Sequence, residues 1–284
     1  MENKYGLYHT HITSKHKLFD LKLKEVWKYK DLIWLFTKRS FVVQYKQTIL
    51  GPAWLFINPI ITSLIYAFVF NGIAGIGTDG VPGILFYLSG TAIWNVFANC
   101  LTGNASTFTA NADVFGKVYF PRLTTPISNV ISSFIQFLIQ FFMVLCFLLF
   151  FLITGQVTPN WWAFLLIPIV LVHLGFLGMG IGIIISSMTT KYRDLSVLVG
   201  FGVQLWMYAT PIVYPLSQLG DGIFKNILLI NPVTTPIEVF RYAVIGKGTI
   251  EPLFLIVSLI ITLLVLVLGI MVFNKVERNF MDTV

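Results

Sequence analysis

Six long blocks of the sequence contain no aspartate, glutamate, lysine or arginine. They run over 51–70, 83–108, 123–153, 163–188, 195–214 and 252–273. A helix needs about 20 apolar residues to cross the hydrocarbon core, and one charge at its centre costs at least about 2.5 kcal/mol. The sequence therefore predicts an all-α membrane protein with six transmembrane helices. Four spans are the alternative, but they would break the alternation of charge described below or leave apolar blocks of about 30 residues stranded.

Composition excludes an ordinary soluble domain. Only 11% of the 284 residues are charged and 56% are apolar, whereas soluble domains carry about 25% charged residues. Cys100 and Cys146 both lie within apolar blocks, so no disulfide framework and no metal site is predicted. No nucleic-acid partner is expected for such a chain.

Lysine and arginine are distributed unevenly between the two sides of the predicted bundle. Sixteen of the nineteen lie in the N-terminal region, in the loops near 109–122 and 189–194, and in the tail after 273. The three other loops, near 71–82, 154–162 and 215–251, hold only three. Because cytoplasmic loops carry the excess of positive charge, both termini are predicted to be cytoplasmic.

Residues 1–50 are predicted to be a basic cytoplasmic tail with an amphipathic helix at the membrane interface. Leu32, Leu35, Phe36 and Val43 fall on one side at helical spacing, although Arg39 interrupts that side. Anionic lipid attracts such basic, aromatic helices, and a solvated tail is the alternative. Residues 51–273 are assigned to the six-span domain and 274–284 to a cytoplasmic tail.

The outer segment between the fifth and sixth blocks departs from a plain loop. Prolines interrupt the end of the fifth block, and a moderately apolar stretch follows. Broken backbone at membrane depth requires protein or a water-filled cavity around it, so residues 215–250 are predicted to form external re-entrant helices, with Glu238 and Arg241 paired on one helix face. An ordinary extracellular loop is the alternative. The candidate gate residues are Pro211, Pro215, Asn231, Pro232, Glu238 and Arg241.

Two short cytoplasmic loops carry mixed charged and large apolar side chains. A purely solvated loop has no need of the apolar ones, so the first loop is predicted to be a short amphipathic helix that docks on a partner protein. The candidate docking residues are Asp113, Val114, Phe115, Lys117, Tyr119 and Arg122, with Lys191, Tyr192, Arg193 and Asp194 in the second loop.

The fourth block contains the one histidine of the spans, His173, and a series of glycines, Gly175, Gly178, Gly180 and Gly182. The glycines predict close helix packing. A lone intramembrane histidine favours an interhelical hydrogen bond, with a pore-lining group as the alternative. No carboxylate in the spans accompanies it, so a proton relay is disfavoured and the energy source is expected on another polypeptide.

Four stretches resemble the membrane subunit of type 2 ATP-binding-cassette exporters, specifically the branch that exports O-antigen, capsule or wall teichoic acid. They are YKQTILGPAWLFINP (45–59), DVFGKVYFPR (113–122), KYRD (191–194), and TPIVYP (210–215) with NPVTTPIEVFR (231–241). The resemblance covers nearly the whole chain from about residue 30, and the motifs are specific as a set rather than singly.

The resemblance implies a homodimer in a bacterial inner or plasma membrane, with two ATPase subunits beneath it. This chain has no G-x-x-x-x-G-K-[ST] loop, so it is expected to be a permease without a cofactor of its own, and ATP and Mg²⁺ are expected on the partner. Residues 113–122 would sit in a groove of the ATPase. The implied cargo is a glycan that is linked through diphosphate to a polyprenyl lipid and is moved to the outer face of the membrane. Membrane lipid is expected as a further partner that surrounds the subunit.

Aromatic side chains suit sugar rings, although they also form interface belts in every membrane protein. The pathway candidates are Trp54, Tyr66, Tyr87, Trp94, Trp206, Tyr208 and Tyr214. The second block is also polar at Asn95 and Asn99, which fits a wet cavity or a helix end emerging from lipid. Alternatives to a glycan exporter are a drug or lipid exporter of the same type, a membrane-embedded enzyme such as a glycan-modifying one, and a channel.

Overall fold

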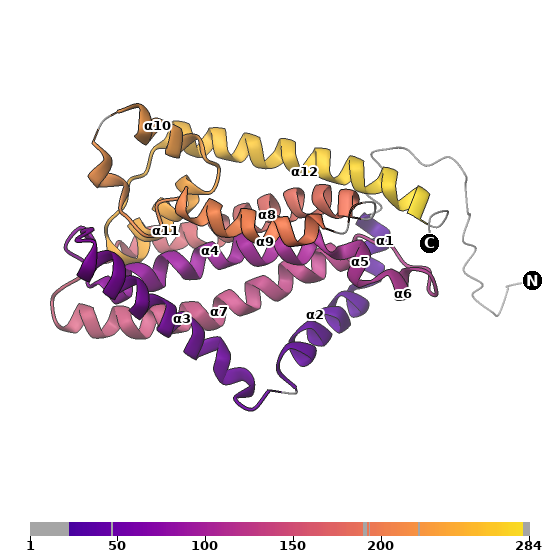
Figure 1. Ribbon diagram of the computed structural model, residues 1–284, viewed down its shortest axis with the longest axis horizontal. Coiled ribbons are helices and arrows are strands. Elements are labelled where there is room, and N and C mark those ends of the chain that lie inside the picture. Colours follow the sequence, from indigo (N-terminus) through magenta and orange to yellow (C-terminus); the bar gives the residue numbers. More distant parts are fainter. Residues whose placement is uncertain (1–22, 47, 190–191, 193, 221, 281–284) are drawn as a thin grey trace, which may run out of the picture.

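A computed structural model of the chain describes residues 23–46, 48–189, 192, 194–220 and 222–280. All regular structure within these residues is helical, and the long helices run side by side along the molecule (Figure 1). Five helical segments are long and apolar enough to cross a membrane, which makes the chain a multi-pass membrane protein. They are Gly51–Ile73, Gly83–Ala105, Thr124–Ile153, Trp161–Thr189 and Pro252–Val276.

These spans agree with five of the six predicted blocks to within a few residues. The first consists of η1 (Gly51–Ala53), α3 (Trp54–Tyr66) and a π-helical segment, η2 (Ala67–Ile73). The others are α4 (Gly83–Ala105), α7 (Thr124–Ile153), η3 (Trp161–Leu166) with α8 (Ile167–Thr189), and α12 (Pro252–Phe280).

Helix α4 lies at the centre and packs against α3, α7, α8 and α11. Its contact with α8 depends on glycine. A Cβ on Gly178 would lie 2.7 Å from the Phe97 carbonyl oxygen, and one on Gly182 would lie 2.6 Å from the Asn104 Cβ. A Cβ on Gly180 would lie 3.0 Å from the Cα of Leu266 in α12. The predicted close packing of the fourth block is confirmed, because the glycines of α8 let the backbones of α4 and α12 approach its own backbone closely.

The sixth predicted span is not confirmed, because the block at 195–214 forms a shorter helix. Helix α9 (Leu195–Tyr208) has 14 residues, about 21 Å of rise against about 30 Å of hydrocarbon. Apolar residues continue beyond it, but its backbone turns at Ala209. Asn231 donates to the Ala209 carbonyl at 3.2 Å, and Arg241 donates to the carbonyls of Pro211 and Ile212. Side chains from a later segment thus satisfy acceptors that a continuing helix would have satisfied.

The segment between α9 and α12, which the sequence predicts to be external, is folded rather than an open loop. It contains η4 (Leu216–Leu219), α10 (Ile223–Ile230) and α11 (Thr234–Ile245). Helix α11 is almost entirely buried against α4, α8 and η3. Helix α10 buries Leu229 but exposes Ile223 and Phe224. These helices lie at the end of the bundle opposite the final turns of α12 (Figure 1).

The N-terminal helices α1 (Leu23–Lys28) and α2 (Lys30–Tyr45) precede the spans, and α2 packs on α7. The predicted apolar side of α2 is divided. Phe36 is buried and Leu32 half-buried, whereas Leu35 and Val43 are exposed. Phe36 shares an apolar cluster with Phe273 of α12, so both ends of the described chain lie at one end of the bundle. Residues 1–22 of the predicted tail lie outside the described residues.

Candidate functional site

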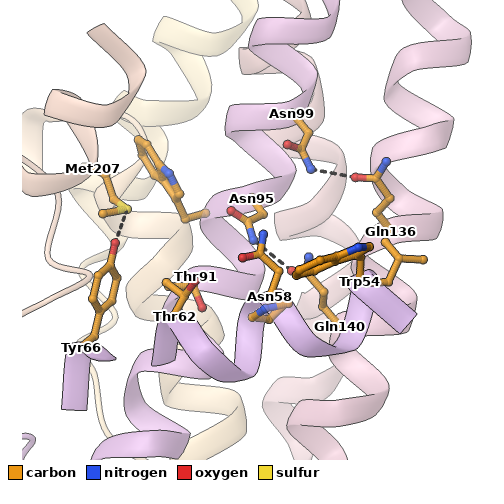
Figure 2. A pocket seen from close by; sticks show the side chains of 13 residues that line it. Trp54, Asn58, Thr62, Tyr66, Thr91, Asn95, Asn99, Gln136, Gln140 and Met207 are labelled. Atoms are coloured by element: carbon orange, nitrogen blue, oxygen red, sulfur yellow. Dashed lines mark hydrogen bonds between the residues drawn. The ribbon is translucent and has the colours of Figure 1, made fainter. Parts of the chain in front are cut away.

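A cavity of about 420 Å³ opens between α3, α4 and α7, with Met207 of α9 at its edge (Figure 2). Helix α3 lines it with Trp54, Asn58, Thr62 and Tyr66. These residues recur every fourth position, so they share one face of the helix. An apolar span thus carries a continuous stripe of indole, amide, hydroxyl and phenol groups.

Two amide pairs cross the opposite wall of the cavity. Asn95 Nδ2 of α4 donates to Gln140 Oε1 of α7 at 3.2 Å, and Asn99 Nδ2 donates to Gln136 Oε1 at 2.9 Å (Figure 2). Thr91 completes the polar lining on α4. Polar side chains inside a membrane span are costly unless they face one another, protein or water. Their gathering around one hollow indicates a hydrated cavity.

Three of the seven aromatic pathway candidates line this cavity, namely Trp54, Tyr66 and Trp94. The Tyr66 hydroxyl contacts Met207 Sδ at 3.8 Å. Asn95 and Asn99 line it as well, in agreement with the wet-cavity interpretation of the second block. Asn58 and Thr62 of α3 and Gln136 and Gln140 of α7 were not predicted from the sequence, although their four-residue spacing indicates a shared helix face.

The other four aromatic candidates lie outside the cavity. Tyr87 is fully buried and packs edge to face on Tyr66 of α3. Trp206 contacts Phe97 edge to face and donates from Nε1 to Asn231 Oδ1 at 3.2 Å. Tyr208 is exposed, and the Tyr214 hydroxyl donates to its carbonyl oxygen at 3.4 Å. Tyr87 and Trp206 therefore hold helices together.

Arg241 forms the centre of a buried cluster at the end of the bundle where α10 and α11 lie. Its guanidinium donates to the carbonyl oxygens of Pro211 and Ile212, the latter at 2.7 Å. It also pairs with Glu238 Oε1 at 3.5 Å and lies 4.0 Å from the ring centroid of Phe86. The predicted pairing of Glu238 and Arg241 on one helix face is confirmed.

One further hydrogen bond and one glycine fix this cluster. Glu238 Oε2 accepts from the backbone N–H of Thr249 at 3.1 Å. Gly90 of α4 makes room for the guanidinium, since a Cβ there would lie 2.9 Å from Arg241 Nη2. The cluster therefore joins α4, α11 and the broken end of α9 into one packed unit.

The remaining gate candidates lie around this cluster. Asn231 Nδ2 donates to Thr210 Oγ1 at 3.1 Å. The Pro232 carbonyl accepts from Ser258 Oγ at 2.6 Å, and Ser258 Oγ lies 3.0 Å from His173 Nε2. A serine hydroxyl has one proton to donate, so His173 Nε2–H donates to it. His173 thus makes the expected interhelical bond. Pro215 directly precedes η4.

At the opposite end, the loop between α4 and α7 divides its docking candidates between core and surface. It forms α5 (Thr107–Ala110) and the single turn α6 (Ala112–Phe115). Phe115 is buried against Phe108 and Phe120, and the Arg122 guanidinium lies 5.5 Å from its ring centroid. Only part of the predicted docking set is therefore available to a partner. Val114 is half-buried, while Asp113, Lys117 and Tyr119 are exposed.

The second loop lies beside the first. The Phe108 N–H donates to Ser186 Oγ at 3.2 Å, and Thr189 Oγ1 donates to the Ala105 carbonyl at 3.2 Å. These bonds fix the end of α8 to the segment that leaves α4. Tyr192 and Asp194 are exposed just beyond it. Lys191 and Arg193 lie outside the described residues.

Comparison with known proteins identifies relatives over most of the chain. The family model described as ABC-2 type transporter matches residues 31–245. Two Klebsiella pneumoniae proteins named O-antigen export system permease protein RfbA are each 28% identical, with 89% of this chain and 94% of each relative covered. A Myxococcus xanthus protein of the same name is 27% identical over 75% of this chain and 80% of its own length.

The family match spans well over half of the chain and includes α3 to α11, together with the cavity and the outer cluster. The five long apolar helices of the chain, of which Pro252–Val276 lies beyond the matched residues, agree with a membrane subunit. This chain belongs to the ABC-2 type transporter family.

Proposed function

We propose that this chain is the membrane-spanning subunit of an ATP-driven exporter. It moves a polyprenyl-diphosphate-linked polysaccharide from the cytoplasmic to the outer face of a bacterial inner or plasma membrane. The observation that carries the proposal is the likeness to O-antigen export permeases over 89% of the chain. The names of these relatives favour a polysaccharide over the drug or lipid cargo of the alternative.

The cavity supports a hydrated cargo. Apart from Leu55, Pro59 and Met207, its wall consists of amides, hydroxyls and aromatic rings, and Trp54, Tyr66 and Trp94 supply the rings. Aromatic faces pack on sugar rings while amides and hydroxyls exchange hydrogen bonds with sugar hydroxyls. We take these three rings as the aromatic part of the pathway.

Export by this chain requires an energy source on a partner. Two ATP-binding-cassette subunits, which bind ATP and Mg²⁺, dock on the end formed by the two short loops. The exposed side chains of Lys117, Tyr119 and Tyr192 support this docking surface, since apolar and charged groups occur together there. Both termini lie on the same, cytoplasmic side, as the distribution of lysine and arginine favours.

A second copy of the chain completes the pathway. Trp54 and Asn58 are exposed on α3, and an amide that faced hydrocarbon would be costly. Helix α9 beside the cavity exposes Val197, Phe201 and Leu205. A homodimer that pairs these surfaces would convert an open hollow into an enclosed passage.

The two ends of each subunit have separate tasks in this proposal. Helices α10 and α11 dip into the membrane from outside, and the cluster around Arg241 forms the outer gate. Helix α2 lies at the inner interface, where its exposed Trp34, Leu35 and Val43 contact lipid beside its lysines.

Deletion of the gene in its own host tests the proposed function. We expect surface polysaccharide to disappear, while polyprenyl-diphosphate-linked glycan accumulates on the cytoplasmic face, and re-expression of the wild-type chain to restore export. Mass spectrometry of extracted lipids and surface labelling of the glycan measure the two pools. Unchanged surface polysaccharide together with no accumulation of the lipid-linked glycan would refute the proposal.

A further inference from the structure

We propose that the two amide pairs between α4 and α7 form a binding subsite for the hydroxyl groups of uncharged sugar units. The proposal rests on the proposed function and assigns the recognition of sugar hydroxyls to Asn95, Asn99, Gln136 and Gln140. Asn58 of α3 faces them across the cavity as a fifth amide (Figure 2).

The pairs form the rungs of a ladder. Asn95 and Asn99 lie four residues apart on α4, and Gln140 and Gln136 lie four residues apart on the antiparallel α7. Successive rungs are therefore separated by about one helical turn, or about 6 Å along the helix. A pyranose ring has a comparable length, so neighbouring sugar units of one chain would meet successive rungs.

The rungs keep unused hydrogen-bonding capacity. A carboxamide offers two N–H donors and an oxygen with two lone pairs, and each rung uses one donor and one acceptor for its internal bond. The side chains of Asn58 and Thr62 on the facing helix α3 make no hydrogen bond to any of the described residues. Sugar hydroxyls both donate and accept, so they match this mixture of donors and acceptors.

Other parts of the cargo fit this wall poorly. A diphosphate is bound by arginine or lysine, and no charged side chain is among the residues that line the cavity. An acyl chain would remove water from the amides without replacing their hydrogen bonds, at a cost in free energy. The lining thus favours neutral polyol over lipid tail or diphosphate.

The same helices carry a third pair that serves as an internal control. Asn129 Nδ2 donates to Asn104 Oδ1 at 3.3 Å, but neither residue lines the cavity. Asn104 is fully buried. If the ladder only held the helices together, all three rungs would act alike.

The test uses the complete exporter, with its ATPase subunits, in lipid nanodiscs. Asn99→Leu with Gln136→Met, and Asn95→Leu with Gln140→Met, each remove one rung at nearly constant volume. Asn104→Leu with Asn129→Leu is the matched control, and Asn58→Leu changes the facing amide without breaking a bond. The readout is ATP hydrolysis stimulated by the host's own lipid-linked glycan, with bare polyprenyl diphosphate as a second probe.

We expect each rung replacement inside the cavity to raise the glycan concentration for half-maximal stimulation by about 2- to 10-fold. Asn58→Leu should shift it in the same direction. The response to bare polyprenyl diphosphate and the response of the control variant should stay as in the wild type.

Equal shifts for the cavity rungs and for the Asn104–Asn129 control would overturn the subsite. It would also be overturned if Asn58→Leu and at least one of the two cavity-rung replacements produced no shift. An equal shift with bare polyprenyl diphosphate would assign the rungs to the carrier lipid instead. A wild-type exporter that neither responds to lipid-linked glycan nor exports it would refute the proposed function itself, whereas a wild-type glycan response in every variant refutes only the ladder.

Discussion

Arg241 makes several different interactions through one buried side chain. Its guanidinium supplies hydrogen bonds to two carbonyls beyond α9, faces Glu238 and covers the ring of Phe86. A buried pair of opposite charges adds little by itself, because desolvation offsets the attraction. Loss of one member is different, since it leaves the other charge and the former acceptors without partners.

Arg241→Met should therefore destabilise the protein strongly. We expect a loss of about 3–5 kcal/mol in the free energy of unfolding, which thermal denaturation of the purified protein in detergent would measure. Lys247→Met is the control, because Lys247 is exposed on the segment that follows α11. Equal thermal stability of the two variants would contradict the structural role of Arg241.

The loop between α4 and α7 contains both buried and exposed aromatic side chains. Phe115 points into an aromatic cluster that includes Phe108 and Phe120, whereas Tyr119 is 81% exposed. The ring of Phe36 reaches the same cluster from α2. The buried rings hold the element in place and leave its exposed tip available for a partner.

Tyr119→Ala and Phe115→Ala should consequently fail in different ways. For Tyr119→Ala we expect about tenfold weaker association with the ATPase, typical of the loss of an interface anchor, with unchanged thermal stability. Phe115→Ala should cost about 3–5 kcal/mol of stability because it empties a packed site. Co-purification of the ATPase and thermal denaturation separate the two effects. Full ATPase binding by the Tyr119 variant would refute the docking surface.

The sequence predicts the long helices because charge is excluded from each of them, a local property. The position at which α9 ends is not determined by local sequence. Its apolar residues continue to Tyr214, but the backbone turns at Ala209, and Asn231 and Arg241 lie more than twenty residues away along the chain. The cavity has the same origin, since Gln136 and Gln140 gain their meaning only from the antiparallel neighbour that places Asn99 and Asn95 opposite them.

The molecule as a whole separates two ends along one bundle. The docking loops and α1 lie at one end, and α10 and α11 lie at the other (Figure 1). From the distribution of basic residues we predict that the first end faces the cytoplasm. This orientation can be measured without reference to transport.

Cysteine labelling tests the orientation directly. In a Cys146→Ser background, which removes the exposed native thiol, Gln156→Cys should react with a membrane-impermeant maleimide in intact cells. Lys117→Cys should react only after the membrane is permeabilised. Both positions are exposed in the structure, so accessibility alone does not separate them. The reverse pattern would invert the assignment of the two faces.

Helix α4 connects the two ends without a joint. Phe86 and Gly90 near its outer end contact the Arg241 guanidinium, and its inner end leads through Ser106 to Phe108 in the docking loop. Its 23 residues contain no proline and span about 34 Å. A continuous helix of this kind is stiff, so a displacement of one end along its axis would also displace the other end. In the proposed exporter, one helix would then couple the docking site of the ATPase to the cluster around Arg241.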